Sequence, residues 1–242
     1  MRTPHFDALS PDVIQIWRAE LDRPEEEISQ LLNLISDDER ERAKRFHFPR
    51  DRGRFVIGRG VLRTILAAHC GVSPQDVRFE YSRFGKPSLV RLDNTGDIRF
   101  NLSHSGGQAL YAFGLGRETG VDIEQIRPDY PGMEIAKRFF SPSESDALSK
   151  LDSSDQAEAF FTCWTRKEAY IKAKGEGLSL PLHQFDVTFA PGEPARLQTT
   201  RPDASEALRW SMVDLRPLKG FVAAVVAEGR DWHPASYSWR FE

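Results

Sequence analysis

The spacing of apolar side chains predicts a strand followed by three helices in the first third of the chain. Residues 13–17 alternate in the manner of a half-buried strand, whereas between 25 and 35 apolar residues recur every three or four positions, which is typical of an amphipathic helix. Ser36 and the acidic residues after it resemble an N-cap with negative charges in the first helical turn, so a second helix is expected to run to about Pro49. A third is expected over 51–69.

Shorter apolar segments further along the chain predict strands separated by turns. Before the midpoint they lie at 77–81, 98–102, 109–115 and 122–124. Gly85-Lys86-Pro87 marks a turn, and the polar residues 103–107 are expected to form a loop between two of these strands.

The order of predicted elements repeats in the second half of the chain. Residues 43–46 and 136–139 share the sequence Ala-Lys-Arg-Phe, and each copy precedes a further helix and then a strand. A four-residue identity can arise by chance, but the matching order of elements favours a duplication. The expected fold class is therefore α+β, with two similar halves, 1–117 and 118–242, related by a pseudo-twofold axis around a cleft.

Composition narrows the classes of function. The 33 Lys and Arg residues against 36 Asp and Glu leave a net charge of −3, which argues against a coat for nucleic acid, and 40% hydrophobic residues allow a packed core. Cys70 and Cys163 can form neither a disulfide framework nor a multi-Cys metal site. No apolar run approaches the ~20 residues that a bilayer requires, and none follows the first residues as in a signal peptide. We therefore expect a cytoplasmic protein without membrane or nucleic-acid partners.

Two acidic residues lie in one predicted strand, in the sequence Gly120-Val-Asp-Ile-Glu124. The period of a strand places Asp122 and Glu124 on the same face, about 6.6 Å apart. They repel each other unless a positive charge lies between them, and a hard divalent cation with oxygen ligands would supply it. The alternative is an ordinary solvated strand edge.

Residues 161–172 are predicted to form a helix that carries charges on its aromatic face. At about 100° per residue, four side chains fall on one narrow face: Phe161, Trp164, Glu168 and Lys172. An exposed Glu–Lys pair at this spacing would contribute only about 0.2–0.5 kcal/mol and would have polar neighbours. A partly buried carboxylate and ammonium that face a charged ligand fit the pattern better. Glu168 would then complete a Mg²⁺ site with the two strand carboxylates.

Basic residues are concentrated between Arg40 and Arg63, where nine stand against two acids. A solvated helix face, a nucleic-acid patch or a pocket for a small polyanion would each account for them, although no zinc-finger or RNP-like pattern accompanies them. Residues 101–107 offer hydroxyls, an imidazole and backbone N–H groups that suit phosphate oxygens. The chain contains no Gly-x-Ser-x-Gly elbow, P-loop or zinc-spaced histidine pair.

Several motifs occur together in one order, and in combination they resemble the 4′-phosphopantetheinyl transferase superfamily. The principal two are Gly120-Val-Asp122-Ile-Glu124 and Trp164-Thr-Arg-Lys-Glu168-Ala-Tyr-Ile-Lys172. Further matches between residues 40 and 185 are Gly85-Lys86-Pro87, Phe100-Asn-Leu-Ser-His-Ser105 and Arg138-Phe-Phe-Ser141. The resemblance is to the long, pseudodimeric, surfactin-synthetase-activating type.

This resemblance implies the transferase fold, with an active site in the cleft between the halves, and a reaction. Coenzyme A donates its phosphopantetheine arm to a serine of an apo acyl or peptidyl carrier protein and leaves adenosine 3′,5′-bisphosphate. Asp122, Glu124 and Glu168 would hold Mg²⁺, or Mn²⁺ in its place. Glu168 and Lys172 would be catalytic, Glu168 as base or metal ligand and Lys172 against the diphosphate. The enzyme is expected to be a monomer.

The remaining coenzyme contacts are implied for the first half of the chain. Ser103 and His104 would contact coenzyme phosphates, Arg54 and Arg42 would bind the 3′-phosphate, and Lys86 would lie beside the adenosine. The resemblance does not fix the roles of two further acidic residues. Glu39 replaces a lysine found in a relative, and Glu144 stands where some members have an acid near the metal.

Two other functions use the same residues. A Mg²⁺-dependent phosphatase or nuclease would need the same carboxylates but no carrier protein, and a binding module would retain the site without turnover. If the chain is a transferase, its carrier is expected to dock near Phe139, Phe140, Lys167 and Lys174, unless the two phenylalanines belong to the core.

Overall fold

The computed structural model describes residues 7–90, 96–201 and 203–241. The first half begins with one strand and three helices and continues with four strands and a short 3₁₀ turn, η1 (Pro74–Asp76). The helices and strands are β1 (Val13–Glu20), α1 (Glu25–Leu32), α2 (Asp37–Lys44), α3 (Pro49–Cys70), β2 (Phe79–Tyr81), β3 (Pro87–Leu89), β4 (Ile98–Ser105) and β5 (Gln108–Leu115).

The second half begins at a strand that carries the predicted carboxylates. Its strands and helices are β6 (Thr119–Gln125), α4 (Gly132–Phe139), α5 (Pro142–Ser149), α6 (Ser153–Lys174), β7 (Phe185–Val187), β8 (Leu197–Thr200), β9 (Trp210–Leu215), β10 (Phe221–Glu228) and β11 (His233–Ser238). Short 3₁₀ turns lie at η2 (Gly177–Ser179), η3 (Leu182–Gln184) and η4 (Ala204–Arg209). The chain is thus α+β, as predicted.

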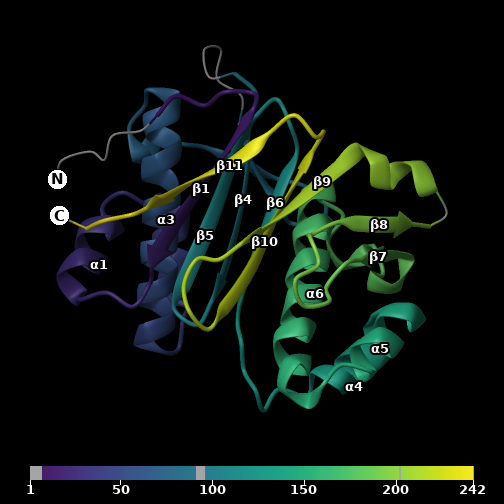
Figure 1. The fold of residues 1–242 in the computed structure, drawn as a ribbon. Coiled ribbons are helices and arrows are strands. Elements are labelled where there is room, and N and C mark those ends of the chain that lie inside the picture. The colour runs from purple at the N-terminus through teal and green to yellow at the C-terminus, as the bar shows by residue number, and fades with distance from the viewer. Residues whose placement is uncertain (1–6, 91–95, 202, 242) are drawn as a thin grey trace.

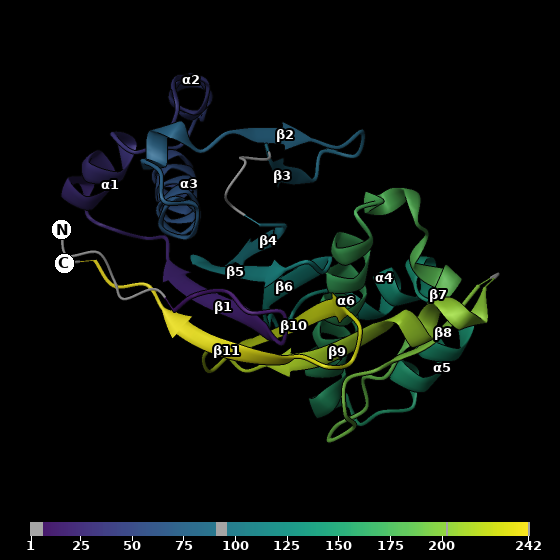
Figure 2. The ribbon, with the colours of Figure 1, turned by 90° about the horizontal axis from the view of Figure 1, so that it is seen from above.

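Two main sheets form the centre of the molecule, with α1 to α3 beside one and α4 to α6 beside the other (Figure 1). The strand orders are β11-β1-β5-β4 and β6-β10-β9, and the hairpins β2-β3 and β7-β8 stand apart (Figure 2). β11 pairs in parallel with β1. The last strand of the chain therefore belongs to the first sheet and ties the C-terminal end to the N-terminal half.

Three apolar clusters pack these layers together. Tyr111 and its neighbours in the first sheet pack against α3, and Val226 and its neighbours in the second sheet pack against α6. The third cluster lies between the sheets and contains Ile14, Val121 and Ile123. One face of β6 is therefore committed to the core between the sheets, which leaves its other face to meet α6.

Each half contains a short helix with a capping box and a long helix of 22 residues. The Ala-Lys-Arg-Phe repeat does not mark this pair of helices in both halves. α2 and α5 each begin with a capping box, Ser36 with Glu39 and Ser141 with Glu144. α3 and α6 each have 22 residues and end at a left-handed glycine. The repeated tetrapeptide instead ends α2 in the first half and α4 in the second, so it does not mark equivalent helices.

Two element boundaries differ from the sequence prediction. α2 ends at Lys44, and α3 begins at Pro49 itself, because proline is well tolerated in the first turn of a helix. β4 extends to Ser105, so most of the predicted polar loop is strand. Only Gly106 and Gly107 turn the chain, both with positive φ. This extension brings the polar residues of β4 alongside β6.

Candidate active site

Hydrogen bonds between side chains of β4 and β6 align the two sheets. Ser103 Oγ donates to Asp122 Oδ1 at 2.7 Å, and Ser105 Oγ donates to Glu124 Oε2 at 2.7 Å. Asn101 Oδ1 accepts from the backbone N–H of Val121 at 3.0 Å. Because alternate residues of a strand share a face, two serines meet two carboxylates in register.

The close approach of α6 to β6 brings the second set of charges to this face. A Cβ at Gly120 would lie 2.2 Å from the carbonyl oxygen of Ala169, so only glycine allows the helix to pack here. Lys172 Nζ then donates to Asp122 Oδ1 at 2.7 Å and to Ser103 Oγ at 2.8 Å. The strand motif and the helix motif therefore meet at one carboxylate.

Negative charge exceeds positive charge around Asp122. Burial, together with the charges of Asp122 and Glu124, raises the pKa of Glu168 to about 7, and Lys172 offsets only part of this effect. Burial also raises the pKa of Glu124, the Ser105 hydrogen bond opposes that rise, and the charge of Asp122 adds to it. The second oxygen of Asp122, Oδ2, is buried and has no hydrogen-bond partner among the described residues. The cluster can accept a further positive charge.

The carboxylates predicted to bind a metal ion do not form a complete metal-binding site in this structure. Within residues 7–90, 96–201 and 203–241, no three His, Cys, Asp or Glu side chains are grouped as a metal site. The Lys172 ammonium instead supplies the positive charge beside Asp122. The donor set nevertheless has the oxygen chemistry that Mg²⁺ prefers.

A guanidinium and an imidazole lie at the edge of this cluster. Arg54 binds Asp22 through two hydrogen bonds, Nε to Oδ1 at 2.7 Å and Nη2 to Oδ2 at 2.6 Å. A Cβ at Gly107 would lie 2.4 Å from Asp22 Oδ2, so the β4–β5 turn packs directly against this pair. Partial desolvation and the nearby charges of Lys172 and Arg54 keep the pKa of His104 below its usual value. These groups suit an anion at the mouth of the site.

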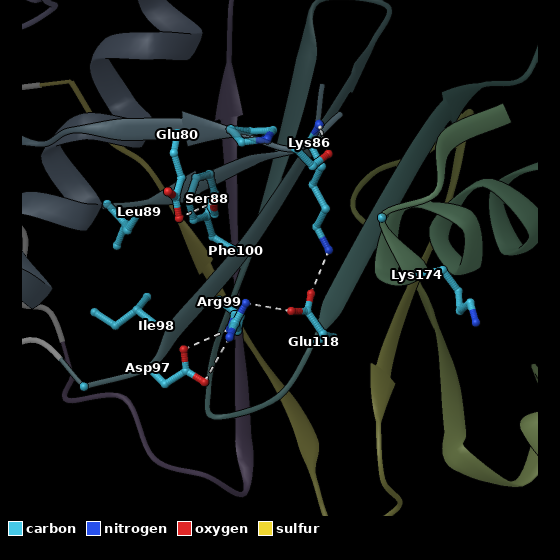
Figure 3. A pocket seen from close by; sticks show the side chains of 14 residues that line it. Glu80, Lys86, Ser88, Leu89, Asp97, Ile98, Arg99, Phe100, Glu118 and Lys174 are labelled. Atoms are coloured by element: carbon cyan, nitrogen blue, oxygen red, sulfur yellow. Dashed lines mark hydrogen bonds and ion pairs between the residues drawn. The ribbon is translucent and has the colours of Figure 1, made fainter. Parts of the chain in front are cut away.

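Arg42 and Lys86 make their contacts outside the cluster around Asp122. The exposed Arg42 guanidinium lies over the Phe55 ring, 5.2 Å from its centroid. Lys86 Nζ donates to Glu118 Oε2 at 2.9 Å and to the carbonyl oxygen of Ala173 at 3.0 Å. Lys86 lines a pocket of about 450 Å³ that residues of both halves enclose (Figure 3). Lys86 thus reaches from the first half to the C-terminal end of α6.

Several charged residues from the basic segment are engaged in the structure of the first half. The buried Glu39 carboxylate binds Arg59 and Arg63. Arg40 binds Asp37. The predicted balance of these basic residues by acids is therefore present, but Glu39 and Arg63 are buried rather than on a solvated helix face.

Glu144 has a comparable role in the second half. It caps α5, lies 2.7 Å from Lys167 Nζ and accepts from the backbone N–H of Val187 at 2.8 Å. The expected docking residues Phe140 and Lys167 are buried, and Lys174 binds Glu206. Of the four, Phe139 alone is an exposed large hydrophobic residue. The core alternative therefore holds for Phe140, and Lys167 cannot contact a docked protein.

The sequence pattern assigns no role to three residues near the site. Ser105 lay in the polar segment, but only its position on β4 shows that it bonds Glu124. Asp22 precedes Arg54 by 32 residues, and Glu118 follows Lys86 by 32, with no local pattern that links either pair.

Comparison with known proteins shows which family the chain resembles. Residues 118–226 match the model of the 4′-phosphopantetheinyl transferase superfamily, and residues 17–113 match the model described as 4′-phosphopantetheinyl transferase, N-terminal. The chain is 41% identical to the 4′-phosphopantetheinyl transferase HetI of Nostoc sp. over 96% of this chain and 94% of the relative. It is 34% identical to the transferase Sfp of Bacillus subtilis over 90% of this chain and 94% of that relative.

A solved structure gives a weaker likeness. The match to the holo-[acyl-carrier-protein] synthase of Thermotoga maritima covers 46% of this chain and 62% of that chain, with 19% identity and a TM-score of 0.35.

The fold and the site define an α+β enzyme whose charged groups are shared between two halves, and the chain belongs to the 4′-phosphopantetheinyl transferase superfamily. Within it, the chain is of the long type to which Sfp belongs, in which the N-terminal and superfamily segments follow each other in one polypeptide. The described residues include no helix with the length and apolar character to cross a membrane.

Proposed function

We propose that the protein transfers the 4′-phosphopantetheine arm of coenzyme A to a serine of an apo acyl or peptidyl carrier protein. The family and the names of its relatives support this reaction. The observation that carries it is the cluster in which Lys172 and Ser103 meet the buried Asp122. Only one of the two Asp122 carboxylate oxygens has a hydrogen-bond partner among the described residues. The proposal assigns catalysis to Glu168 and Lys172.

The carboxylates fit a divalent cation, Mg²⁺ or Mn²⁺, as a further part of the proposal. Asp122, Glu124 and Glu168 would hold it, because Asp122 Oδ2 has no partner among the described residues and burial raises the pKa of the other two acids. Such a cation would supply charge stabilisation at the diphosphate of coenzyme A.

The chain's own cations would bind and orient the coenzyme. Lys172 and Ser103 would contact the diphosphate, and His104 would contact a coenzyme phosphate. Arg54, whose Nε and Nη2 bind Asp22, would contact the 3′-phosphate with the rest of its guanidinium, and Arg42 would add a second charge. Lys86 would lie beside the adenosine, in the pocket that it lines. The first half, 1–117, thus holds most of the coenzyme, and the second half, 118–242, holds the catalytic acids.

Glu168 is the proposed base. The serine oxygen forms a bond to the phosphorus nearer the pantetheine, and the bond from that phosphorus to the bridging oxygen of adenosine 3′,5′-bisphosphate breaks. The serine proton passes to the Glu168 carboxylate. A pKa of about 7 suits this step, because a base is most effective when its pKa lies near the working pH. The enzyme would act as a monomer in the cytoplasm, without nucleic acid or membrane.

Intact-protein mass spectrometry tests the reaction. An apo acyl carrier and an apo peptidyl carrier are incubated with the enzyme, coenzyme A and Mg²⁺, with matched reactions in which a chelator replaces the metal. We expect a mass gain equal to the phosphopantetheine arm and one equivalent of adenosine 3′,5′-bisphosphate. Release of inorganic phosphate or cleavage of nucleic acid without this gain would instead indicate the phosphatase or nuclease.

A further inference from the structure

One ammonium group joins the small hairpin of the first half to both functional elements of the second half. Lys86 lies in the turn between β2 and β3, and its Nζ bonds Glu118 just before β6 and the Ala173 carbonyl in the last turn of α6. β6 carries two of the proposed metal ligands, and α6 carries Glu168 and Lys172. The same Nζ also donates to the Thr119 carbonyl oxygen at the start of β6, at 3.5 Å.

The local structure favours this reach. The hairpin turn is held by the Ser82 hydroxyl, which accepts from the backbone N–H groups of Phe84 and Lys86. At the far end, the carbonyl of Ala173 is one of the helix-terminal groups that lack a partner within the helix. A Cβ at Gly175 would lie 3.2 Å from Lys86 Cδ, so the lysine stem packs against the end of α6. An ammonium at a helix C-terminus is also favoured by the helix dipole.

Glu118 is itself held in place from the first sheet. Its Oε1 accepts from Arg99 Nη1 at 2.8 Å, and Arg99 Nε lies 2.9 Å from Asp97 Oδ1. The Asp97–Arg99–Glu118–Lys86 chain follows one wall of the 450 Å³ pocket (Figure 3). The Glu118 carboxylate is therefore fixed between two cations, one on β4 and one on the hairpin.

We propose that Glu118, held by Arg99, is a positioning residue that fixes Lys86 as a latch between the hairpin and α6 and so shapes the pocket for the nucleoside of coenzyme A. This inference rests on the proposed function, which places the adenosine beside Lys86. Glu118 acts through Lys86 and takes no part in phosphoryl transfer. Its loss therefore weakens binding of the nucleoside part and leaves the chemical step intact.

The test compares Glu118→Gln with a matched control. Asp231→Asn makes the same change in the partner of Arg117, the residue next to Glu118 in the chain, and Asp231 does not line the pocket. We expect Glu118→Gln to raise the KM for coenzyme A about three- to tenfold with kcat within twofold, as for a partly exposed charged hydrogen bond. Binding of adenosine 3′,5′-bisphosphate, measured by calorimetry, should weaken by the same factor, whereas binding of free 4′-phosphopantetheine should not change.

Two further measurements separate positioning from general damage. In Lys86→Met, adding Glu118→Gln should change the KM no further, because the carboxylate acts only through the lysine. Amide hydrogen exchange in Glu118→Gln should be faster at residues 79–89 and 172–177 than in the control.

Three outcomes would overturn the latch. They are unchanged exchange with unchanged bisphosphate affinity, an equal loss of affinity for 4′-phosphopantetheine, or additive effects in the double variant. If the unaltered enzyme transfers no phosphopantetheine, the proposed function fails on its own, and bisphosphate binding and exchange still decide the latch.

Discussion

The long helices α3 and α6 use their charges in different ways. On α3, Arg59 and Arg63 bind Glu39, the acid that caps the preceding short helix. On α6, Lys167 pairs with Glu144, which caps α5 in the same way. In both halves a buried capping glutamate is neutralised by the long helix beside it.

From the next residue onward, α6 departs from this pattern. Glu168 and Lys172 face β6, where Asp122 and Glu124 add two more carboxylates. The balanced pairs are structural, because each buried glutamate lies against cations of the long helix in its own half. The cluster at Asp122 retains excess negative charge and, among the described residues, a carboxylate oxygen without a partner, and we propose that a ligand binds there.

The strongest test of this difference is to neutralise one acid of the Asp122 cluster and one acid of a structural pair. Glu168→Gln should lower the transfer rate about 10²- to 10⁴-fold, the usual contribution of a positioned base. Its unfolding free energy should stay equal or rise, because one of several like charges is removed. Steady-state transfer and urea unfolding measure the two effects, with the exposed Glu158→Gln on the same helix as control. A large loss of stability would make Glu168 structural.

Glu144→Gln should show the opposite behaviour. Glu144 and Lys167 are 3% and 0% exposed in their side chains, so the change leaves a buried ammonium without its carboxylate counter-ion. Breaking such a pair costs about 3–5 kcal/mol in unfolding free energy. Denaturant unfolding measures the loss, and kcat per folded molecule should be retained. Full stability with a loss of activity would place Glu144 in the active site.

Arg54→Ala sharpens the contrast between coenzyme binding and structural pairing in the first half. The KM for coenzyme A should rise about tenfold, as expected for a lost charged hydrogen bond, while the KM for its 3′-dephospho form changes little. Arg50→Ala, which removes an exposed arginine four residues earlier, serves as control. An equal change for both donors would remove Arg54 from the 3′-phosphate site.

The raised pKa of Glu168 predicts a pH effect on stability. Its pKa rises from 4.5 to about 7 in the folded chain, so the folded state holds a proton that the unfolded state releases. This contribution is fully present below about pH 4.5 and is lost as the pH rises through 7, so Tm should fall over that range by about 2–4 °C for each kcal/mol. The slope should flatten in Glu168→Gln, and an identical slope in that variant would contradict the assignment.

The smallest expected effect concerns the carrier. Phe139→Ala, at an exposed position on α4, should raise the KM for the carrier by at most about fivefold and leave that for coenzyme A unchanged. Phe140→Ala, its buried neighbour, should instead reduce stability. If both variants only reduce stability, α4 is not part of the docking surface.

The sequence alone determined the local structure and the family. The capping pattern from Ser36 to Glu39 depends on residues three positions apart, and the shared face of Asp122 and Glu124 follows from the period of a strand. Such short-range regularities are set by backbone geometry, and their order along the chain carried the resemblance that the comparisons confirmed.

Only the tertiary structure decided which partner each charged side chain has. Asp22 meets Arg54, Glu118 meets Lys86, and Lys167 is buried against Glu144. β11 joins β1 across nearly the whole length of the chain. No spacing rule connects these partners, because each contact arises where packed layers bring distant segments together. A charge acquires its role from burial and from the partners that this packing places around it.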